Sequence, residues 1–102
     1  MEFEQKVLNI ITYSGEARNK AMNAITEAKC GRYKKAESNI KEAEDLLIKA
    51  HKKQTSLIQL EASGVRITPS LLLIHGQDHL MNAMMVKDMA VEFVDLYRRL
   101  NE

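Results

Sequence analysis

Apolar residues recur at every third or fourth position through most of the chain, which is the spacing of amphipathic α-helices. The expected helices span residues 3–29, 33–62 and 69–100. Gly31 and Gly64 supply stop signals for the first two helices. Thr68 is a suitable N-cap for the third helix, and Pro69 suits its first turn. The pattern therefore predicts an all-α fold, an antiparallel three-helix bundle that forms a single domain over residues 1–102.

The third expected helix is apolar on almost every side in its first half. Its large apolar residues there are Leu71, Leu72, Leu73, Ile74, Leu80, Met81, Met84 and Met85. Two neighbouring helices cannot cover a helix from all directions, so this half needs a further partner. The pattern therefore predicts that the chain associates with copies of itself through the first half of this helix.

Three polar, titratable residues interrupt one face of the same helix. His75, Asp78 and His79 stand at positions i, i+3 and i+4, so their side chains share that face. The face continues through Asn82, Val86, Met89, Phe93, Leu96, Tyr97 and Leu100. Because most of these residues are apolar, we expect this face to be buried. Buried imidazoles and carboxylates are costly unless they are paired or bound to a ligand, so the cluster indicates a polar network or a functional site.

Three interpretations of this cluster remain open at this point. It forms a buried polar network that fixes the register of an oligomer in a non-catalytic interaction or regulatory module. Alternatively, His75 and His79 ligate a transition metal, although Gly76 stands where the zinc-protease pattern requires Glu. In the third interpretation His75 is a nucleophile that accepts a phosphoryl group, and His79 supplies a hydrogen-bond donor. Gly76 would then leave room for the surface of a partner.

Composition narrows the choice of function. A net charge of +1 gives no basic surface for nucleic acid. The single cysteine, Cys30, cannot form an internal disulfide and is typical of a reducing compartment. The sequence starts without a signal-peptide pattern and has no apolar run of membrane-spanning length. We therefore expect a soluble, cytoplasmic domain.

Three segments resemble a known family. They are YSGEARNKAM (13–22), KAHKKQTSLIQLEASG (49–64) and SLLLIHGQDHLMNAMMVKDMAVEFVDLYRR (70–99). Together they are similar to the enzyme IIA component of the lactose/cellobiose class of the bacterial sugar phosphotransferase system. The resemblance covers nearly the whole chain, and the combination of HGQDHLM with YSGEAR is its most specific part.

This resemblance implies a phosphoryl carrier. His75 would accept a phosphoryl group, on its tele nitrogen, from the phosphocarrier protein HPr and pass it to a cysteine of the IIB component. IIB would in turn phosphorylate a lactose-, cellobiose- or chitobiose-class sugar that enters through the membrane component IIC. Family members are homotrimers, so nine helices would pack around a three-fold axis. Asp78 would hold one divalent cation per trimer at that axis, typically Mg²⁺, and His79 would support the active site.

Overall fold

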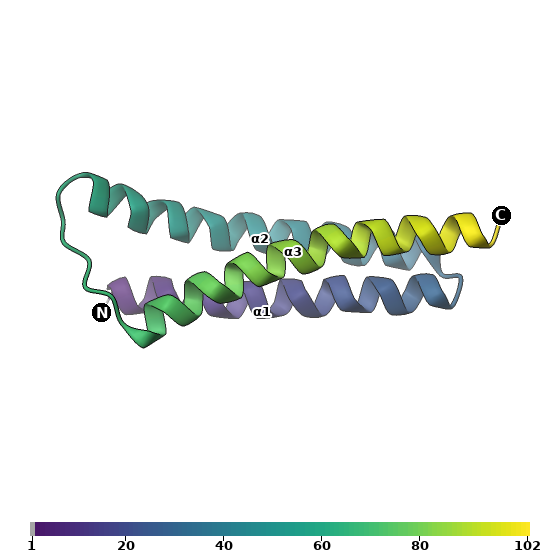
Figure 1. The fold of residues 1–102 in the computed structure, drawn as a ribbon, viewed down its shortest axis with the longest axis horizontal. Coiled ribbons are helices and arrows are strands. Elements are labelled where there is room, and N and C mark those ends of the chain that lie inside the picture. The colour runs from purple at the N-terminus through teal and green to yellow at the C-terminus, as the bar shows by residue number, and fades with distance from the viewer. Residues whose placement is uncertain (1) are drawn as a thin grey trace.

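The computed structural model describes residues 2–102 and contains three α-helices joined by two connections. They are α1 (Glu2–Lys29), α2 (Tyr33–Ala62) and α3 (Leu71–Leu100). The helices form an elongated bundle of 55 × 20 × 19 Å in which α1 and α3 run in the same direction and α2 runs in the opposite one (Figure 1). The all-α prediction is confirmed, and α2 has the predicted bounds. Within residues 2–102 no helix is both long enough and apolar enough to cross a membrane.

The start of α3 differs from the prediction. Ser70, not Thr68, is the N-cap: its backbone is extended, with φ −142° and ψ 161°, and its Oγ accepts a hydrogen bond from the Leu73 amide at 3.1 Å. Thr68 and Pro69 therefore precede the helix. The connection leaves the end of α2 and crosses to the far side of the bundle before α3 begins (Figure 1). The chain stays extended through Pro69 because it has this gap to span.

The core of the bundle consists mainly of small residues. Nine of the fifteen buried hydrophobic residues in the described part of the chain are alanines. Four of them, Ala17, Ala21, Ala24 and Ala28, follow one face of α1. Side chains this short let neighbouring helices approach closely, so many bulkier apolar residues remain on the outside of the single chain.

Within the single chain, the buried face of α3 is not the one predicted. The residues of α3 that are buried are Gly76, Leu80, Ala83, Ala90 and Val94. On the face predicted to be buried, the side chains of Met89, Phe93 and Leu96 are exposed. The reason is the close packing against α1, which small side chains permit and large ones prevent.

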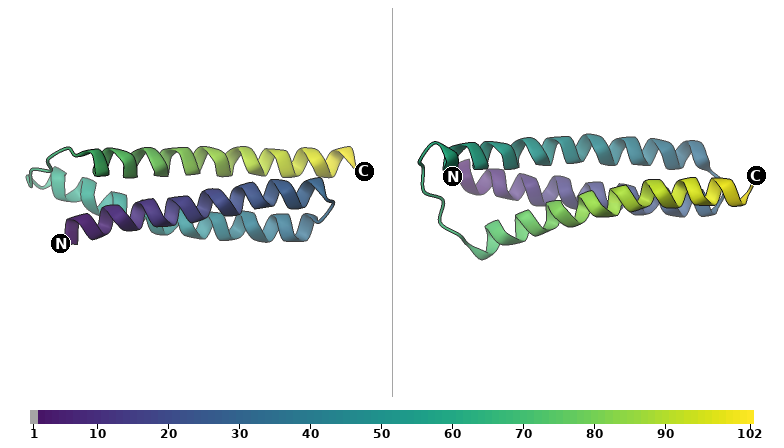
Figure 2. Two further views of the ribbon diagram at one scale, coloured as in Figure 1. Left: turned by 90° about the horizontal axis from the view of Figure 1, so that it is seen from below. Right: turned by 45° about the horizontal axis from the view of Figure 1, so that its top comes forward.

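The first half of α3 diverges from α2. The two helices meet near the C-terminus, where the Tyr33 hydroxyl donates a hydrogen bond to the Tyr97 carbonyl oxygen at 3.3 Å. Toward the other end they separate, and the right-hand view in Figure 2 shows α1 lying between α2 and the first half of α3. There two long side chains bridge the space, because Gln54 Nε2 donates to Gln77 Oε1 at 2.5 Å. This half of α3 therefore rests on α1 and keeps its other faces open.

Candidate functional site

His75 and His79 lie one turn apart on the open half of α3. The His75 side chain is exposed, whereas His79 is half-buried. Their ring centroids are 4.9 Å apart with an interplanar angle of 86°, which is an edge-to-face contact. The structure thus brings the two predicted imidazoles together and leaves His75 accessible to solvent in the single chain.

Gly76 fixes the main chain beside His75. It is buried, and a Cβ atom added to it would lie 3.3 Å from Val7 Cγ1 and 3.6 Å from Ile11 Cγ1. The expectation that Gly76 leaves room for a partner's surface was therefore wrong, because this position faces α1. The close approach at Gly76 holds the peptide of His75 against the bundle while the imidazole projects outward.

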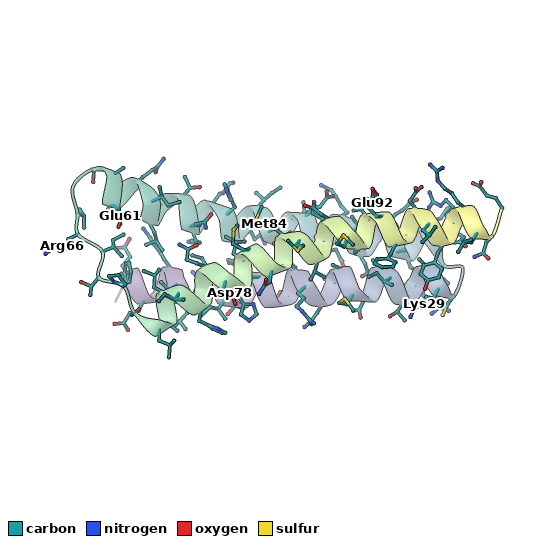
Figure 3. All side chains as sticks on the ribbon, in the orientation of Figure 1. Lys29, Glu61, Arg66, Asp78, Met84 and Glu92 are labelled. Atoms are coloured by element: carbon teal, nitrogen blue, oxygen red, sulfur yellow. The ribbon has the colours of Figure 1, made fainter. Side chains whose placement is uncertain are left out.

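Asp78 is an exposed residue in the first half of α3 (Figure 3). Among residues 2–102 its carboxylate has no ion pair within 4.0 Å and no side-chain hydrogen bond. The neighbouring Gln77, in contrast, is engaged with α2. Within residues 2–102 the Asp78 carboxylate therefore has no partner, and its oxygens are available to bind a cation.

A shallow hollow between α1 and α3 collects the polar groups of this region. It is lined by Arg18, His75, Asp78, His79 and Asn82. The sequence pattern does not single out Arg18, although it stands in the YSGEAR segment. The parallel packing of α1 and α3 brings Arg18 across from His79. In the sequence, the one local signal is that Arg18 follows Gly15 by three residues, because Gly15 faces the His79 ring.

One chain does not assemble a metal centre of its own. Within residues 2–102 no group of three or more His, Cys, Asp or Glu side chains is placed to hold a metal ion. The zinc interpretation would therefore need ligands from another copy. The same applies to Asp78, because a single carboxylate is a weak site for a divalent cation.

The carboxyl and guanidinium groups with shifted pKa values lie at the opposite end of the bundle. A hydrogen bond from Arg32 Nε to Glu27 Oε2, at 2.5 Å, lowers the pKa of Glu27 and raises the pKa of Arg32. A hydrogen bond to Glu37 likewise raises the pKa of Arg98. The first pair links α1 to the residue before α2 and the second links α2 to α3, and neither pair lies in the site around His75.

Residues 5–98 match the protein family described as the lactose/cellobiose-specific IIA subunit of the PTS system. The chain belongs to this family. It is 48% identical over 101 residues to the lichenan-specific phosphotransferase enzyme IIA component of Bacillus subtilis, and the alignment covers 99% of this chain and 92% of that one. It is thus a IIA component of a sugar phosphotransferase system.

Solved structures of IIA subunits have the same fold. The crystal structure of the cellobiose-specific enzyme IIA of Bacillus anthracis is 46% identical, with a TM-score of 0.96 over 99% of this chain and 93% of that one. The solution structure of the IIA(chitobiose)–HPr complex of Escherichia coli is 33% identical, with a TM-score of 0.87 over 100% and 99%. The resemblance to the IIA family that the sequence motifs indicate is therefore confirmed.

Membership of the IIA family bears on the interpretations left open by the sequence. Within the single chain His75 and Asp78 are exposed, so one subunit does not bury them in a polar network of its own. Both the family and the accessible imidazole favour phosphoryl transfer over a buried polar network.

Proposed function

We propose that this IIA subunit is a phosphoryl carrier and that His75 is its phosphoryl acceptor. The observation that carries the proposal is the placement of His75, an exposed imidazole on a main chain held firmly against α1 by Gly76. A carrier has to present the same atom to a donor and then to an acceptor, so it needs an accessible nucleophile in a fixed position.

The reaction is a transfer between nitrogen and sulfur nucleophiles. The tele nitrogen of His75 attacks the phosphorus of phospho-HPr, so that one P–N bond breaks as another forms. A cysteine thiolate of the IIB component then attacks the phosphoryl group and His75 leaves as imidazole. His79, in edge contact with His75, supports the site by limiting ring rotation and by offering an N–H donor.

The names of the relatives support the choice of partners. The Escherichia coli chitobiose subunit is described in complex with HPr, and other relatives are named for lichenan, cellobiose and lactose. We assign HPr as the phosphoryl donor and a IIB component as the phosphoryl acceptor. The membrane component IIC, through which the sugar enters, would be an indirect partner. The protein would act in the cytoplasm on behalf of a disaccharide of the lactose, cellobiose or chitobiose class.

An exposed apolar stripe on α3 supports a homotrimer of nine helices. Leu71, Ile74, Met81 and Met85 are 84%, 58%, 50% and 68% exposed. Together with Asp78 they follow the alternating three- and four-residue spacing of a coiled-coil seam. Three copies that met along this stripe would bury it and would leave His75 beside the seam.

Asp78 fits a cation at the centre of such a trimer. It stands in the middle of the stripe, so three copies would bring three carboxylates together, and these would repel one another unless a cation intervened. Carboxylate oxygens are the ligands that Mg²⁺ prefers, so the Asp78 side chains of three chains would hold one Mg²⁺ per trimer. The ion would neutralise charge at the seam, and no step of phosphoryl transfer would pass through it.

The test of phosphoryl transfer is a labelling experiment with enzyme I, HPr and phosphoenolpyruvate. Intact mass is expected to rise by one phosphoryl group per chain, and peptide mapping at neutral pH should place the group on His75. His75→Ala should abolish the label, whereas His51→Ala, which removes an exposed imidazole from α2, should keep it. Label that survived in His75→Ala would refute the assignment.

A further inference from the structure

The hollow beside His75 contains one basic side chain. Arg18 of α1 is the only Lys or Arg that lines it among residues 2–102, and its other lining residues all come from α3. Arg18 therefore brings a positive charge to His75 from a different helix. In the parallel arrangement of α1 and α3, a long side chain from this position spans the space between them.

The guanidinium of Arg18 has no carboxylate partner within the described part of the chain. Three of the other arginines form ion pairs: Arg32 with Glu27, Arg98 with Glu37, and Arg99 with Asp95. Arg18 forms none, even though Asp78 borders the same hollow, because their charged atoms stay more than 4.0 Å apart. An unpaired guanidinium that lines the same hollow as a nucleophile is available for an anionic ligand.

The space around Arg18 is kept open by a glycine. Gly15 lies one turn before Arg18 on α1, and a Cβ added to it would lie 3.8 Å from Cε1 of His79. A methyl group would fit at this position, but a longer side chain would enter the hollow between Arg18 and His79. The region beside the two imidazoles thus has room for a group of a few atoms.

A phosphoryl group that arrives at His75 needs a positively charged side chain to balance its negative charge. A phosphoryl group carries a charge between about −1.5 and −2 at neutral pH and presents three strong acceptor oxygens. Asp78, which borders the hollow, would repel it. A guanidinium matches phosphoryl oxygens with paired N–H donors and stays charged at every relevant pH.

We propose that Arg18 binds the oxygens of the phosphoryl group as it arrives on His75 and while it remains there, an inference that rests on the carrier function proposed above. Arg18 forms no covalent bond and gives up no proton. The P–N bond of the donor breaks as the P–N bond of His75 forms, and Arg18 offers N–H donors to the non-bridging oxygens throughout. It is a phosphoryl-binding residue supplied by α1.

A structural role for Arg18 makes different predictions. In that case Arg18 would only offset the negative charge of Asp78 when chains assemble. Its removal would then alter the affinity between chains or for Mg²⁺, while the transfer rate of the assembled protein would stay the same. The two roles are separated by measuring transfer and assembly on the same variants.

The experiment is single-turnover phosphorylation by purified phospho-HPr, followed by rapid quench. We expect Arg18→Gln to slow phosphorylation by about 10- to 100-fold. This effect is a little smaller than the rate loss when an enclosed site loses an oxyanion donor, because this hollow is open to water. Arg18→Lys keeps the charge and should recover part of the rate, and added methylguanidine should partly rescue Arg18→Gln. Arg66→Gln is the matched control, since Arg66 lies on the connection before α3, away from Asp78 (Figure 3).

Each outcome decides the proposal. Circular dichroism and sedimentation of every variant establish that the fold and assembly are intact at the concentration used. A rate for Arg18→Gln within twofold of the unmodified protein, or a loss that occurs equally in Arg66→Gln, would overturn the role of Arg18 alone. If the unmodified chain took no label on His75 from an active donor, the carrier function would fail, and the role of Arg18 with it.

Discussion

The imidazole of His79 meets that of His75 edge to face, with centroids 4.9 Å apart and ring planes at 86°. His79 is itself held in place, because it is half-buried and packs near Gly15 of α1. Because His79 packs near α1, its contact with His75 restricts the rotation of an exposed ring that would otherwise turn freely. The two histidines thus differ in exposure, which fits the proposal that His75 reacts and His79 supports it.

Substitution of His79 is expected to slow phosphorylation without abolishing it. His79→Ala removes both the ring contact and the N–H donor, so we expect a loss of about tenfold or more, smaller than the roughly 10²- to 10³-fold loss when an enclosed site loses a donor. His79→Phe keeps an edge-to-face partner and should lose less if packing is the main contribution. Rapid-quench rates with phospho-HPr measure both, and an unchanged rate in His79→Ala would show that the contact has no role in transfer.

Two glycine positions should respond differently to alanine. At Gly15 the added methyl makes an ordinary contact at 3.8 Å, so the gain in helix propensity, about 1 kcal/mol, should appear as added stability. At Gly76 the methyl would lie 3.3 Å from Val7 Cγ1, and this strain should offset most of the gain. Gly76→Leu overfills the contact and should destabilise by about 1–3 kcal/mol.

Urea unfolding measures the free energy of unfolding of these three glycine variants. The protein concentration is kept fixed, because association adds to apparent stability. Equal stabilisation by Gly15→Ala and Gly76→Ala would show that α3 moves away from α1 without cost. The tight contact at Gly76 would then not be needed to place His75.

Two serines offer a matched pair for the same chemical change. The Ser14 hydroxyl is fully buried and has no hydrogen-bond partner among residues 2–102, so Ser14→Ala should stabilise the fold by about 1 kcal/mol. Ser70 caps α3, so Ser70→Ala should destabilise it by about 0.5–2 kcal/mol. Thermal unfolding of both variants should show shifts of opposite sign, and a large destabilisation by Ser14→Ala would reveal an unrecognised partner of its hydroxyl.

Asp78→Leu should separate assembly from cation binding. If three copies meet along the α3 stripe, leucine removes carboxylate repulsion and extends the apolar seam, so trimers should persist at lower protein concentration and in the presence of a chelator. Calorimetric titration with Mg²⁺ should lose its signal. Asp95→Leu, an exposed carboxylate further along α3, is the control and should retain Mg²⁺ binding. Stoichiometric Mg²⁺ binding by Asp78→Leu would contradict the role of Asp78.

The Glu27–Arg32 pair predicts a pH dependence of stability. Its hydrogen bond lowers the pKa of Glu27 in the folded state, so the folded protein favours the ionised carboxylate. This contribution is present above the ordinary carboxyl pKa and is lost as the pH falls through the lowered value. The melting temperature of Glu27→Gln should therefore lie below that of the unmodified protein at pH 7, and the difference should vanish at a pH low enough to protonate Glu27 in the folded state. A difference that persisted at that pH would point to packing rather than charge.

Helical periodicity predicted the elements well because each helix is long and is bounded by strong signals. Gly31 and Gly64 adopt positive φ values of 79° and 103°, as helix-terminating glycines do. The start of α3 was harder to predict because Thr68 and Ser70 are both competent caps. The choice between them depends on how far the connection has to reach, and this distance is set by where α1 and α2 place the third helix.

The faces of α3 could not be assigned from hydrophobicity alone. Periodicity shows which residues share a face, but a close contact with α1 selects the face with small residues, Gly76, Ala83 and Ala90. The more hydrophobic stripe through Met81 and Met85 stays exposed on the single chain, where we propose that another copy contacts it. Arg18 escaped prediction for a related reason: its relation to His75 arises from packing between two helices that are far apart in the sequence.

The contact at Gly76 lowers the conformational cost for two different proteins to dock in turn at the imidazole of His75. Because the main chain beside His75 is fixed when α3 packs on α1, the conformational entropy of that peptide is lost during folding and not at docking. Only the side-chain torsions of His75 remain to be ordered, which costs about 0.5–1.5 kcal/mol for one side chain. A donor and an acceptor that dock in turn would each meet a pre-organised imidazole nitrogen, and neither would have to reshape the protein to reach it.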